Sequence, residues 1–549
     1  MTPTSLNRRS FLRMSATAGG VLLVPAVAMR SSAAAAAPQF AHGVASGDPL
    51  PDGILLWTRV TPTQDSLPGS GAGPRVEVRW EVARDSAFQS VVRSGAVSTG
   101  PDRDHTVKVD VDGLAPATTY WYRFALDGTY SGVGRTRTAP ATDAAVAGLR
   151  FGVISCSNWQ AGYFSAYRHL AARGDLDAVL HLGDYLYEYP VGGFGARGVT
   201  IRPHEPKIEI ISLADYRQRH AQYKTDPDLQ NLHAQHPWVI TWDDHETAND
   251  AWSGGAENHQ PATEGDYATR AAAARRAYLE WMPVRAGANG TIYRRIRFGR
   301  LAELSMLDLR TYRSKQVAPT DGRAVEDPNR TITGDDQLQW LRDGLSGTTA
   351  QWKLVGNPVM IAPVSLDLVP NNLLGPIAKL LGLSQDGIAL NADQWDGYAV
   401  DRRELLQHLV DRRIANTVFL TGDIHSSWAN EVPLDAATYP YHAPIATEFV
   451  TTSMTSDNVD DFLNVAPRTV SLLAEGGIRT LNRHVRAVEV DSHGFSVLDV
   501  RPDRLQTDWW YLADRTKAAS TVRHAASFAV VSKSQKITRV AAPVGPRSL

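Results

Sequence analysis

Cysteine is almost absent from this sequence: Cys156 is the only one in 549 residues, so no disulfide can form within the chain. A charge excess of one sign is also absent, since 56 Lys and Arg residues stand against 58 Asp and Glu residues. This balance argues against nucleic-acid binding, which needs a basic footprint. After the N-terminal leader, no apolar run reaches the roughly 18 to 25 residues of a membrane span, and we therefore expect no stable membrane insertion.

The first 37 residues have the features of an export signal. They begin with a basic segment, continue with a short apolar stretch and end in a run of alanines, as secretory signal peptides do. Arg8 and Arg9 are followed by the triplet SFL, a pattern typical of twin-arginine signals. The sequence predicts a signal peptide over 1–37, recognition by the twin-arginine (Tat) export machinery, and secretion to the extracellular space or the cell wall. A general secretion signal with a coincidental pair of arginines is the alternative.

Residues 38–140 contain short β-rich runs separated by turn signals. In the run VEVRWEVA, apolar and charged residues alternate, which suits a half-buried strand. The spacing of the runs favours an antiparallel sandwich. The stretch DGLAPATTYWYRF is similar to part of a fibronectin type III-like domain, with Tyr120 or Tyr122 as its corner tyrosine. We interpret 38–140 as a structural N-terminal domain, with a binding role as the alternative.

From residue 148 onward, strands alternate with helices, which predicts an α/β catalytic domain over 148–549. LRFGVIS is expected to be a strand, GYFSAYRHLAARG a helix and DAVLHLGD a second, parallel strand. LADYRQRHAQY is expected to be a helix within an insertion over the sheet, and the tail after about residue 484 returns to strands. Ligands of α/β sheets bind at the carboxyl ends of strands, so the residues just after each strand are the candidates for chemistry.

Side chains able to bind metal follow the predicted strands one after another. They are Cys156, then Asp184 and Tyr187 in GDYLY, then Asp244 and His245 in WDDHE, then Asn357, and then Asp423 and His425 in GDIH. Carboxylate and phenolate oxygens suit hard cations, whereas thiolate and imidazole suit a softer transition metal. Each of these segments alone is weak evidence for a metal site, because Gly-Asp is common in turns and a lone cysteine is usually a small core residue. Together they predict a site for more than one metal ion.

The same segments resemble the motifs of the calcineurin-like metallophosphoesterases, and among these the PhoD-type alkaline phosphatases, a branch that includes secreted phospholipase D enzymes. Cys156 stands where many relatives have Asp, Asp244 replaces an Asn, and Asp423 replaces a His. These changes, the leader and the N-terminal sandwich are marks of the PhoD-type branch. The resemblance implies a metallophosphoesterase αββα sandwich preceded by a fibronectin type III-like β-sandwich.

The resemblance also implies two kinds of metal ion. Iron(III), Fe3+, is expected near Cys156, Asp184, Tyr187 and His425, and calcium, Ca2+, around Asp184, Asp244, Asn357 and Asp423. Asn357 falls where the superfamily has a His ligand. The residue types agree, because a phenolate favours a trivalent ion and two additional aspartates favour Ca2+ over Zn2+.

The implied activity is hydrolysis of phosphate monoesters and diesters. Two metal ions roughly 3.5–4 Å apart hold a bridging hydroxide that attacks phosphorus in line. His245 protonates or stabilises the leaving alkoxide. Arg310 and Arg313 follow the strand LSMLDL and are expected to clamp phosphate oxygens, with a surface ion pair as the alternative role.

Two other functions stay open at this point. A Ca2+-dependent phospholipase D would release the head group of a phospholipid, and no amphipathic membrane-binding helix stands out in the sequence to favour it. An exported carbohydrate- or surface-binding protein with a degenerate site would lack ligands, and none of the expected ligands is missing.

Five histidines outside these segments are not expected to bind metal. They are His204, His220, His233, His236 and His259. Because they lie away from the predicted strand ends, we interpret them as loop or surface residues.

Overall fold

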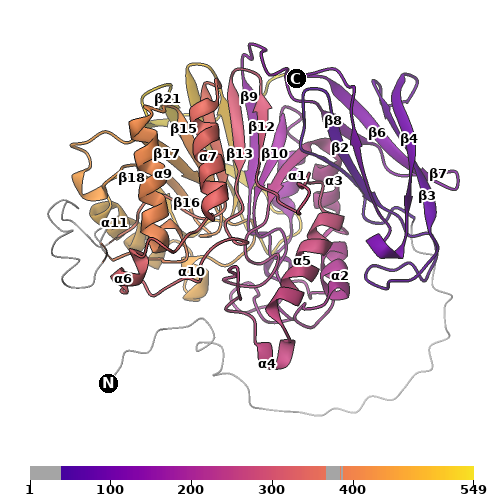
Figure 1. Ribbon diagram of the computed structural model, residues 1–549, viewed down its shortest axis with the longest axis horizontal. Coiled ribbons are helices and arrows are strands. Elements are labelled where there is room, and N and C mark those ends of the chain that lie inside the picture. The colour runs from indigo at the N-terminus through magenta and orange to yellow at the C-terminus, as the bar shows by residue number, and fades with distance from the viewer. Residues whose placement is uncertain (1–38, 366–383, 385–387, 549) are drawn as a thin grey trace. The chain divides into compact units, whose positions relative to one another are not determined.

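Two large β-sheets and the helices around them form most of the computed structural model, which describes residues 39–365, 384 and 388–548 (Figure 1). The predicted signal peptide of residues 1–37 lies outside the described residues. Among the residues that are described, no helix is both long enough and apolar enough to cross a bilayer.

The first sheet has ten strands and gathers segments from both ends of the chain. Its centre contains the parallel pair predicted from the sequence, β9 and β10, and β11 pairs in parallel with the other side of β10. In spatial order the strands are β22 (Ile537–Val540), β21 (Val522–Val531), β20 (Arg504–Leu512), β19 (Gly494–Val500), β9 (Leu149–Ile154), β10 (Ala178–Leu182), β11 (Pro237–Thr241), β1 (Val44–Gly47), β2 (Ile54–Arg59) and β5 (Thr106–Val111). Four strands of the C-terminal tail therefore extend this sheet, as expected.

The second sheet has seven strands, and its centre is also parallel. In spatial order the strands are β12 (Arg294–Phe298), β13 (Ala302–Met306), β14 (Trp352–Asn357), β15 (Thr417–Thr421), β17 (Ala446–Val450), β16 (Ser427–Val432) and β18 (Val485–Glu489). Parallel neighbours place their carboxyl ends at one edge, so this sheet presents a second row of strand ends.

The two sheets pack face to face through alternate residues of their strands. Leu180 of β10 belongs to a core shared with Leu354 of β14 and Val418 of β15. Its neighbour Val179 belongs instead to the core on the outer side of the first sheet. Because successive side chains of a strand point to opposite faces, an uninterrupted apolar run fills both layers of core at once.

Helices cover the outer face of each sheet. Those on the first sheet are α1 (Ser165–Ala171), α2 (Leu213–Tyr223), α3 (Pro227–Gln235) and α5 (Tyr267–Trp281), and those on the second include α7 (Asp335–Gly347) and α9 (Ala399–Asp411). Shorter helices are α4 (Pro261–Glu264), α6 (Gly322–Val325) and α10 (Val459–Phe462), and α11 (Val470–Leu481) lies beside β18. The segment LADYRQRHAQY is helix α2, and a capping box of Ser212 and Asp215 begins it. The αββα layering predicted from the sequence is confirmed.

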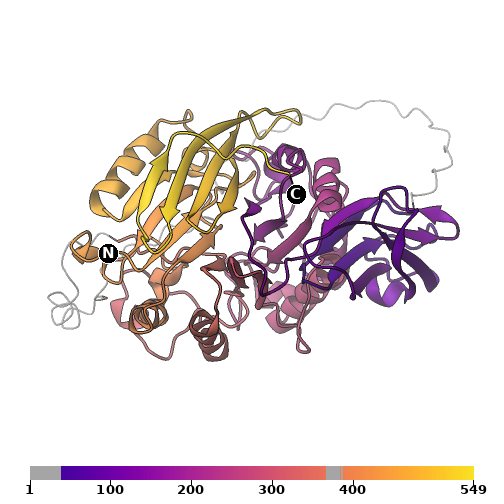
Figure 2. The same cartoon turned by 90° about the horizontal axis from the view of Figure 1, so that it is seen from above.

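An N-terminal β-sandwich precedes these layers and lies at the opposite end from the C-terminal strands (Figure 2). Its separate sheet consists of β4 (Val91–Thr99), β3 (Val76–Ala83), β6 (Thr119–Leu126), β7 (Thr129–Tyr130) and β8 (Gly134–Arg137). This sheet shares an apolar core with β2 and β5 of the ten-stranded sheet. Tyr120, not Tyr122, makes the corner bond, because its hydroxyl accepts from the Ala115 N–H at 2.9 Å.

Strand pairing crosses the boundary proposed between 38–140 and 148–549. β1 pairs in parallel with β11, through Ser46 with Pro237 and Gly47 with Trp238. β1, β2 and β5 thus complete the sheet that carries β9, β10 and β11. The division into domains remains a proposal about the sequence, since hydrogen bonds of one sheet join the two regions.

The five histidines interpreted as loop or surface residues are all buried, so a surface position is wrong, although His204 and His259 do lie in loops. They are His204, His220, His233, His236 and His259, all at most 7% exposed. Aromatic stacking explains part of their burial: the rings of His233 and Trp238 are 3.9 Å apart. Burial lowers the pKa of His233 and of His220 well below the ordinary value, which keeps both rings neutral.

Lys224 lies in the same region and is a buried cation without a carboxylate partner among the described residues. Its Nζ donates to the Tyr185 hydroxyl at 3.2 Å and lies 3.3 Å from His233 Nε2 and 4.5 Å above the Trp57 ring. Burial, and then the charge of Lys108, lower the pKa of Lys224 to about 7. An unfolded lysine keeps its proton to higher pH, so folding releases this proton and stability rises with pH above about 7.

Lys224→Met should remove that pH dependence. We expect the unfolding free energy of the wild type to rise relative to the variant by up to about 1.4 kcal/mol per pH unit between pH 7 and 10. Guanidinium unfolding of both proteins at several pH values measures this difference, with the exposed Lys536→Met as the control. Wild type and Lys224→Met curves that stay parallel over this range would contradict the assignment.

Candidate metal centre

The predicted ligands lie just beyond the carboxyl ends of strands from both sheets. Cys156 follows β9, Asp184 follows β10 and Asp244 follows β11. On the second sheet Asn357 ends β14, and Asp423 and His425 follow β15. The face-to-face packing of the sheets brings the two rows of strand ends together.

Four of these residues have the left-handed backbone conformation that non-glycine residues seldom adopt. The φ angles are 56° for Cys156, 56° for Asp184, 59° for Asp423 and 54° for His425. Each turns the chain sharply where a strand stops. Several residues with an unfavourable backbone conformation at one site are typical of functional sites, because the surrounding structure stabilises that conformation.

Possible ligand atoms gather into three groups, and the atoms of each group lie within 4.8 Å of one another. The groups are Cys156 with Asp184 and His425, Asp184 with Asp244 and His245, and Asp243 with Asp244 and Asp423. Asp184 belongs to the first two groups and Asp244 to the last two. The three groups form a chain linked by shared carboxylates, which is the arrangement a multi-metal site requires.

Tyr187 joins the first group. Its hydroxyl donates to Asp184 Oδ2 at 2.9 Å, lies 3.4 Å from His425 Nε2 and accepts from Ser456 at 2.6 Å. His425 Nδ1 lies 2.7 Å from the Asp457 carbonyl oxygen, to which it donates when Nδ1 carries the proton. That bond fixes the ring and leaves Nε2 facing the thiol, carboxylate and phenol, as second-sphere contacts do for ligating histidines.

Asn357 is held differently from the other predicted ligands. Its Oδ1 accepts from the Trp395 indole N–H at 2.9 Å, and its Nδ2 donates to the Val359 carbonyl at 2.5 Å. The side chain is buried among these partners. A metal would therefore share the amide oxygen with Trp395.

The donor set fits cations of two kinds. Asp184 Oδ1 is buried and has no hydrogen-bond partner in the described part of the chain. Burial and then the Asp184 charge raise the pKa of the Cys156 thiol well above its usual value, and burial together with Asp244 raises the pKa of Asp184. Anions this close need a nearby positive charge to ionise together. Thiolate, phenolate and imidazole suit a transition metal, whereas the aspartates suit a hard cation.

Comparison with known proteins assigns the chain to a family. The family model described as PhoD-like phosphatase matches residues 151–509, the range that contains every predicted ligand. The chain belongs to the PhoD-like phosphatase family. The family's N-terminal domain model matches residues 26–140.

Two similar proteins agree with this assignment. The alkaline phosphatase D of Bacillus subtilis (strain 168) is 35% identical over 541 residues, which cover 95% of this chain and 87% of that protein. A solved structure described as "Structure of PhoD" has a TM-score of 0.81 at 34% identity, covering 92% of this chain and 93% of that one. Like its family, this PhoD-like phosphatase is a hydrolase that acts on phosphoric esters.

In this PhoD-like phosphatase a carboxylate that sequence analysis missed holds His245. His245 Nδ1 lies 2.7 Å from Glu188 Oε2, and the other oxygen of Glu188 accepts from the Asn249 N–H and from Asn258. Burial lowers the pKa of His245, but the charges of Asp244 and Glu188 outweigh it and raise the pKa well above its ordinary value. Glu188 directly follows the motif GDYLY. This position next to predicted ligands was the sequence feature that could have identified it as part of the site.

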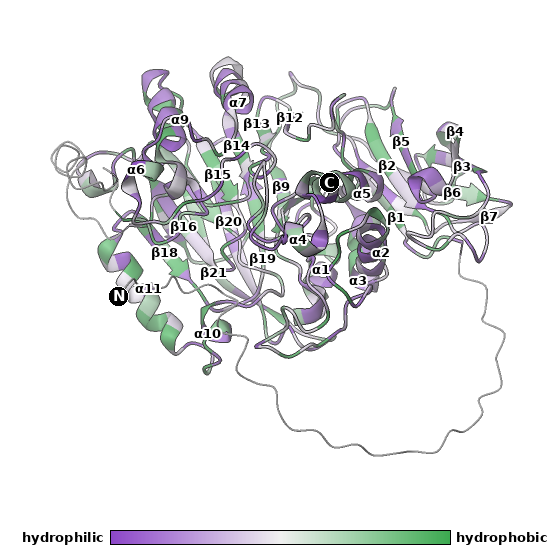
Figure 3. Ribbon diagram, turned by 60° about the horizontal axis from the view of Figure 1, so that its bottom comes forward, coloured by the Kyte–Doolittle hydropathy of each residue, from purple (hydrophilic) through white to green (hydrophobic). Residues whose placement is uncertain are grey.

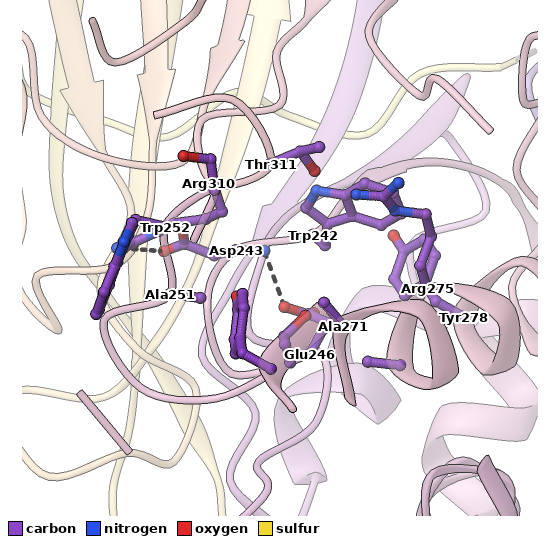
Figure 4. Close-up of a pocket in the computed structure, with 14 residues that line it drawn as sticks. Trp242, Asp243, Glu246, Ala251, Trp252, Ala271, Arg275, Tyr278, Arg310 and Thr311 are labelled. Atoms are coloured by element: carbon purple, nitrogen blue, oxygen red, sulfur yellow. Dashed lines mark hydrogen bonds and ion pairs between the residues drawn. The ribbon is translucent and has the colours of Figure 1, made fainter. Parts of the chain in front are cut away.

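Arg310 lies among carboxylates at the same edge of the PhoD-like phosphatase. It pairs with Asp243 through Nε, lies 3.0 Å from Asp393 and 3.4 Å from Asp423, and is 3% exposed. Figure 4 shows Arg310 and Asp243 together in the wall of a pocket. The guanidinium thus neutralises the acidic cluster, and a phosphate oxygen would compete with these carboxylates for it.

Three further side chains support the site. Glu246 belongs to the motif WDDHE, Asp393 lies outside the predicted motifs, and Arg313, expected as a phosphate clamp or a surface ion pair, is not at the surface. Glu246 accepts from the backbone N–H groups of Asp184, Tyr185 and Asp243, which ties the first two ligand segments together. Asp393 pairs with both Arg310 and Arg313. Arg313 is fully buried and also donates to the Ala251 carbonyl at 2.9 Å, so it braces the loops of the site.

Proposed function

We propose that this enzyme is a secreted, metal-dependent phosphoesterase that hydrolyses phosphate monoesters and diesters. The observation that carries the proposal is the position of Asp184, which lies within ligand distance of two different groups of metal-binding side chains. A carboxylate shared in this way can bridge two ions, and two-metal sites are typical of phosphatases.

The residue types divide the proposed ions. Cys156, Tyr187 and His425, with Asp184, would hold Fe3+, and Asp243, Asp244 and Asp423, with Asp184 and Asn357, would hold Ca2+. When bound, such ions polarise the phosphoryl oxygens and activate the water that attacks phosphorus. Asp243 is added here to the ligands expected from the sequence.

His245 is the proposed general acid. Glu188 binds Nδ1 and leaves Nε2 as the atom that gives a proton to the leaving alkoxide. The charges of Asp244 and Glu188 raise the pKa of His245 above its ordinary value, which favours the protonated ring. Arg310 would stabilise the ionised carboxylates, and it could turn toward a phosphate oxygen once cations compete for those carboxylates.

Two phosphate ester substrates test the proposed function. Purified enzyme with its metals should hydrolyse a nitrophenyl phosphate monoester and the corresponding bis-ester, and iron and calcium should be found by elemental analysis. Removal of metal by a chelator should abolish both activities. Enzyme that lacks stoichiometric metal after gentle purification, with neither ester hydrolysed, would contradict the proposal and revive the surface-binding alternative.

The second candidate is a Ca2+-dependent phospholipase D. Phosphatidylcholine micelles are the discriminating substrate, since release of choline faster than hydrolysis of the monoester favours this candidate. The observation in its favour is Phe462 of α10, an exposed apolar side chain that stacks on Phe194, which in turn stacks on His425. We also propose export by the twin-arginine route. This part depends on the sequence of residues 1–37 alone, because the structure does not describe them.

A further inference from the structure

Helices α10 and α11 expose large apolar side chains that the sequence analysis did not single out. These are Phe462 (43% exposed), Leu463 (51%), Leu472 (52%) and Leu473 (78%), which we call the α10–α11 face. Figure 3 shows α11 as a largely hydrophobic helix at the margin of the molecule. No amphipathic helix stood out in the sequence, yet α11 has one apolar exposed side and one side packed on the core. The adjacent Gly476 and Gly477 weaken helix propensity and conceal the pattern.

The opposite side of α11 explains why the face points outward. Ala474 and Ile478 pack against a core that contains Val485 and Val488 of β18. Residues three and four apart share one side of a helix, so the positions beside Ala474 and Ile478 must face away from this core. Leu472 and Leu473 therefore stand outside the packed structure and are available for a partner.

Positive charge lies at the C-terminal end of the same helix. Arg479, Arg483 and Arg486 line a surface pocket of about 480 Å³. Among the described residues no carboxylate pairs with Arg479 or Arg483, and Arg486 lies 3.7 Å from Glu431. Guanidinium groups bind phosphate oxygens in pairs. Apolar side chains with arginines beside them are the composition of helices that lie in the surface of an anionic bilayer.

The face is continuous with the candidate metal centre. The rings of Phe462 and Phe194 stack with centroids 6.0 Å apart and an interplanar angle of 8°, and Phe194 stacks on His425 at 6.4 Å. A row of aromatic rings thus leads from a proposed iron ligand to the apolar surface. A membrane bound at this face would hold its lipid head groups near the mouth of the site.

We propose that the α10–α11 face and the three arginines dock the enzyme on an anionic phospholipid surface. A second copy of the chain is disfavoured as the occupant, because the self-apposed arginines of a symmetric pair would repel one another.

Vesicle sedimentation tests the docking directly and needs no turnover. The mature chain should bind phosphatidylcholine vesicles containing about one third phosphatidylglycerol more tightly than pure phosphatidylcholine vesicles, and 0.5 M salt should weaken this binding. Leu472→Ser/Leu473→Ser should lower the partition coefficient about tenfold or more. Arg479→Glu/Arg483→Glu should lower it similarly on the anionic vesicles alone. Leu67→Ser and Arg539→Glu, exposed residues elsewhere, are the matched controls.

Hydrolysis of a soluble nitrophenyl ester by every variant should equal that of the wild type. Wild type that binds neither vesicle, or face variants that bind as well as the controls, would overturn the docking. A dimer in solution that becomes a monomer in Leu472→Ser/Leu473→Ser would also overturn it, since a second copy would then cover the face. Vesicle binding without hydrolysis of any ester would leave the docking intact and contradict the proposed function alone.

Discussion

Asp184→Asn should lower kcat/KM for a nitrophenyl phosphate ester by about a thousandfold or more, because metal ions contribute several kcal/mol of transition-state stabilisation. Asparagine has nearly the same shape and tolerates the left-handed conformation of residue 184, where φ is 56°. The fold should therefore persist. Since Asp184 belongs to two ligand groups, loss of its charge should lower the content of both metals, which elemental analysis of the purified variant measures.

The same strand supplies the control for Asp184. Asp177 lies before β10, accepts from the Arg150 N–H at 2.7 Å and is ion-paired with Arg547, at the end of the strand away from the site. Asp177→Asn should lose some stability but keep its metals and its activity. Asp184→Asn with unchanged metal content and unchanged kcat/KM would refute the shared-ligand interpretation.

Arg310→Gln should destabilise the metal-free protein by about 3–5 kcal/mol, the usual cost of leaving buried charges without their partner. The side chain is 3% exposed and pairs with Asp243, Asp393 and Asp423. Its removal leaves these carboxylates facing one another. Guanidinium unfolding after treatment with a chelator measures the loss, and added Ca2+ should recover part of it by replacing the missing positive charge.

Two further variants separate charge from shape. Arg310→Lys keeps the positive charge and should recover part of the stability, although a lysine cannot contact two carboxylates with a planar fork. Arg75→Gln removes a guanidinium that is 57% exposed and paired with Asp102, and it should change the unfolding free energy by less than about 1 kcal/mol. Equal stability of Arg310→Gln and the wild type would show that the guanidinium does not balance the cluster.

That the predicted ligands lie close together could be predicted from the sequence, and the reason is the geometry of parallel strands. Parallel strands end at a common edge, so polar residues at successive strand ends meet in space even when they are far apart in the chain. Cys156, Asp184 and Asp423 follow this rule. Asp393 does not, because it lies in a loop before η4 (Trp395–Tyr398) and reaches the site only through its pairing with Arg310 and Arg313.

The burial of polar residues was harder to predict than the strands. A single histidine such as His233 carries no periodicity, so its stacking on Trp238 depends on the tertiary packing of α3. Glu188 and Glu246 are buried for the same kind of reason: each satisfies backbone or histidine N–H groups supplied by another segment. Such partners are set by the fold, not by neighbours in the sequence.

The pairing of β1 with β11 makes the order of synthesis important. Strand β1 covers the free side of β11, although β11 is synthesised much later in the chain than β1. A truncated chain that began at residue 148 would contain every proposed ligand, yet it would leave β11 as an open edge, and open edges recruit strands from other molecules. In the full chain β1 covers this side of β11, so β1 must wait until β11 has been synthesised before the two strands can pair.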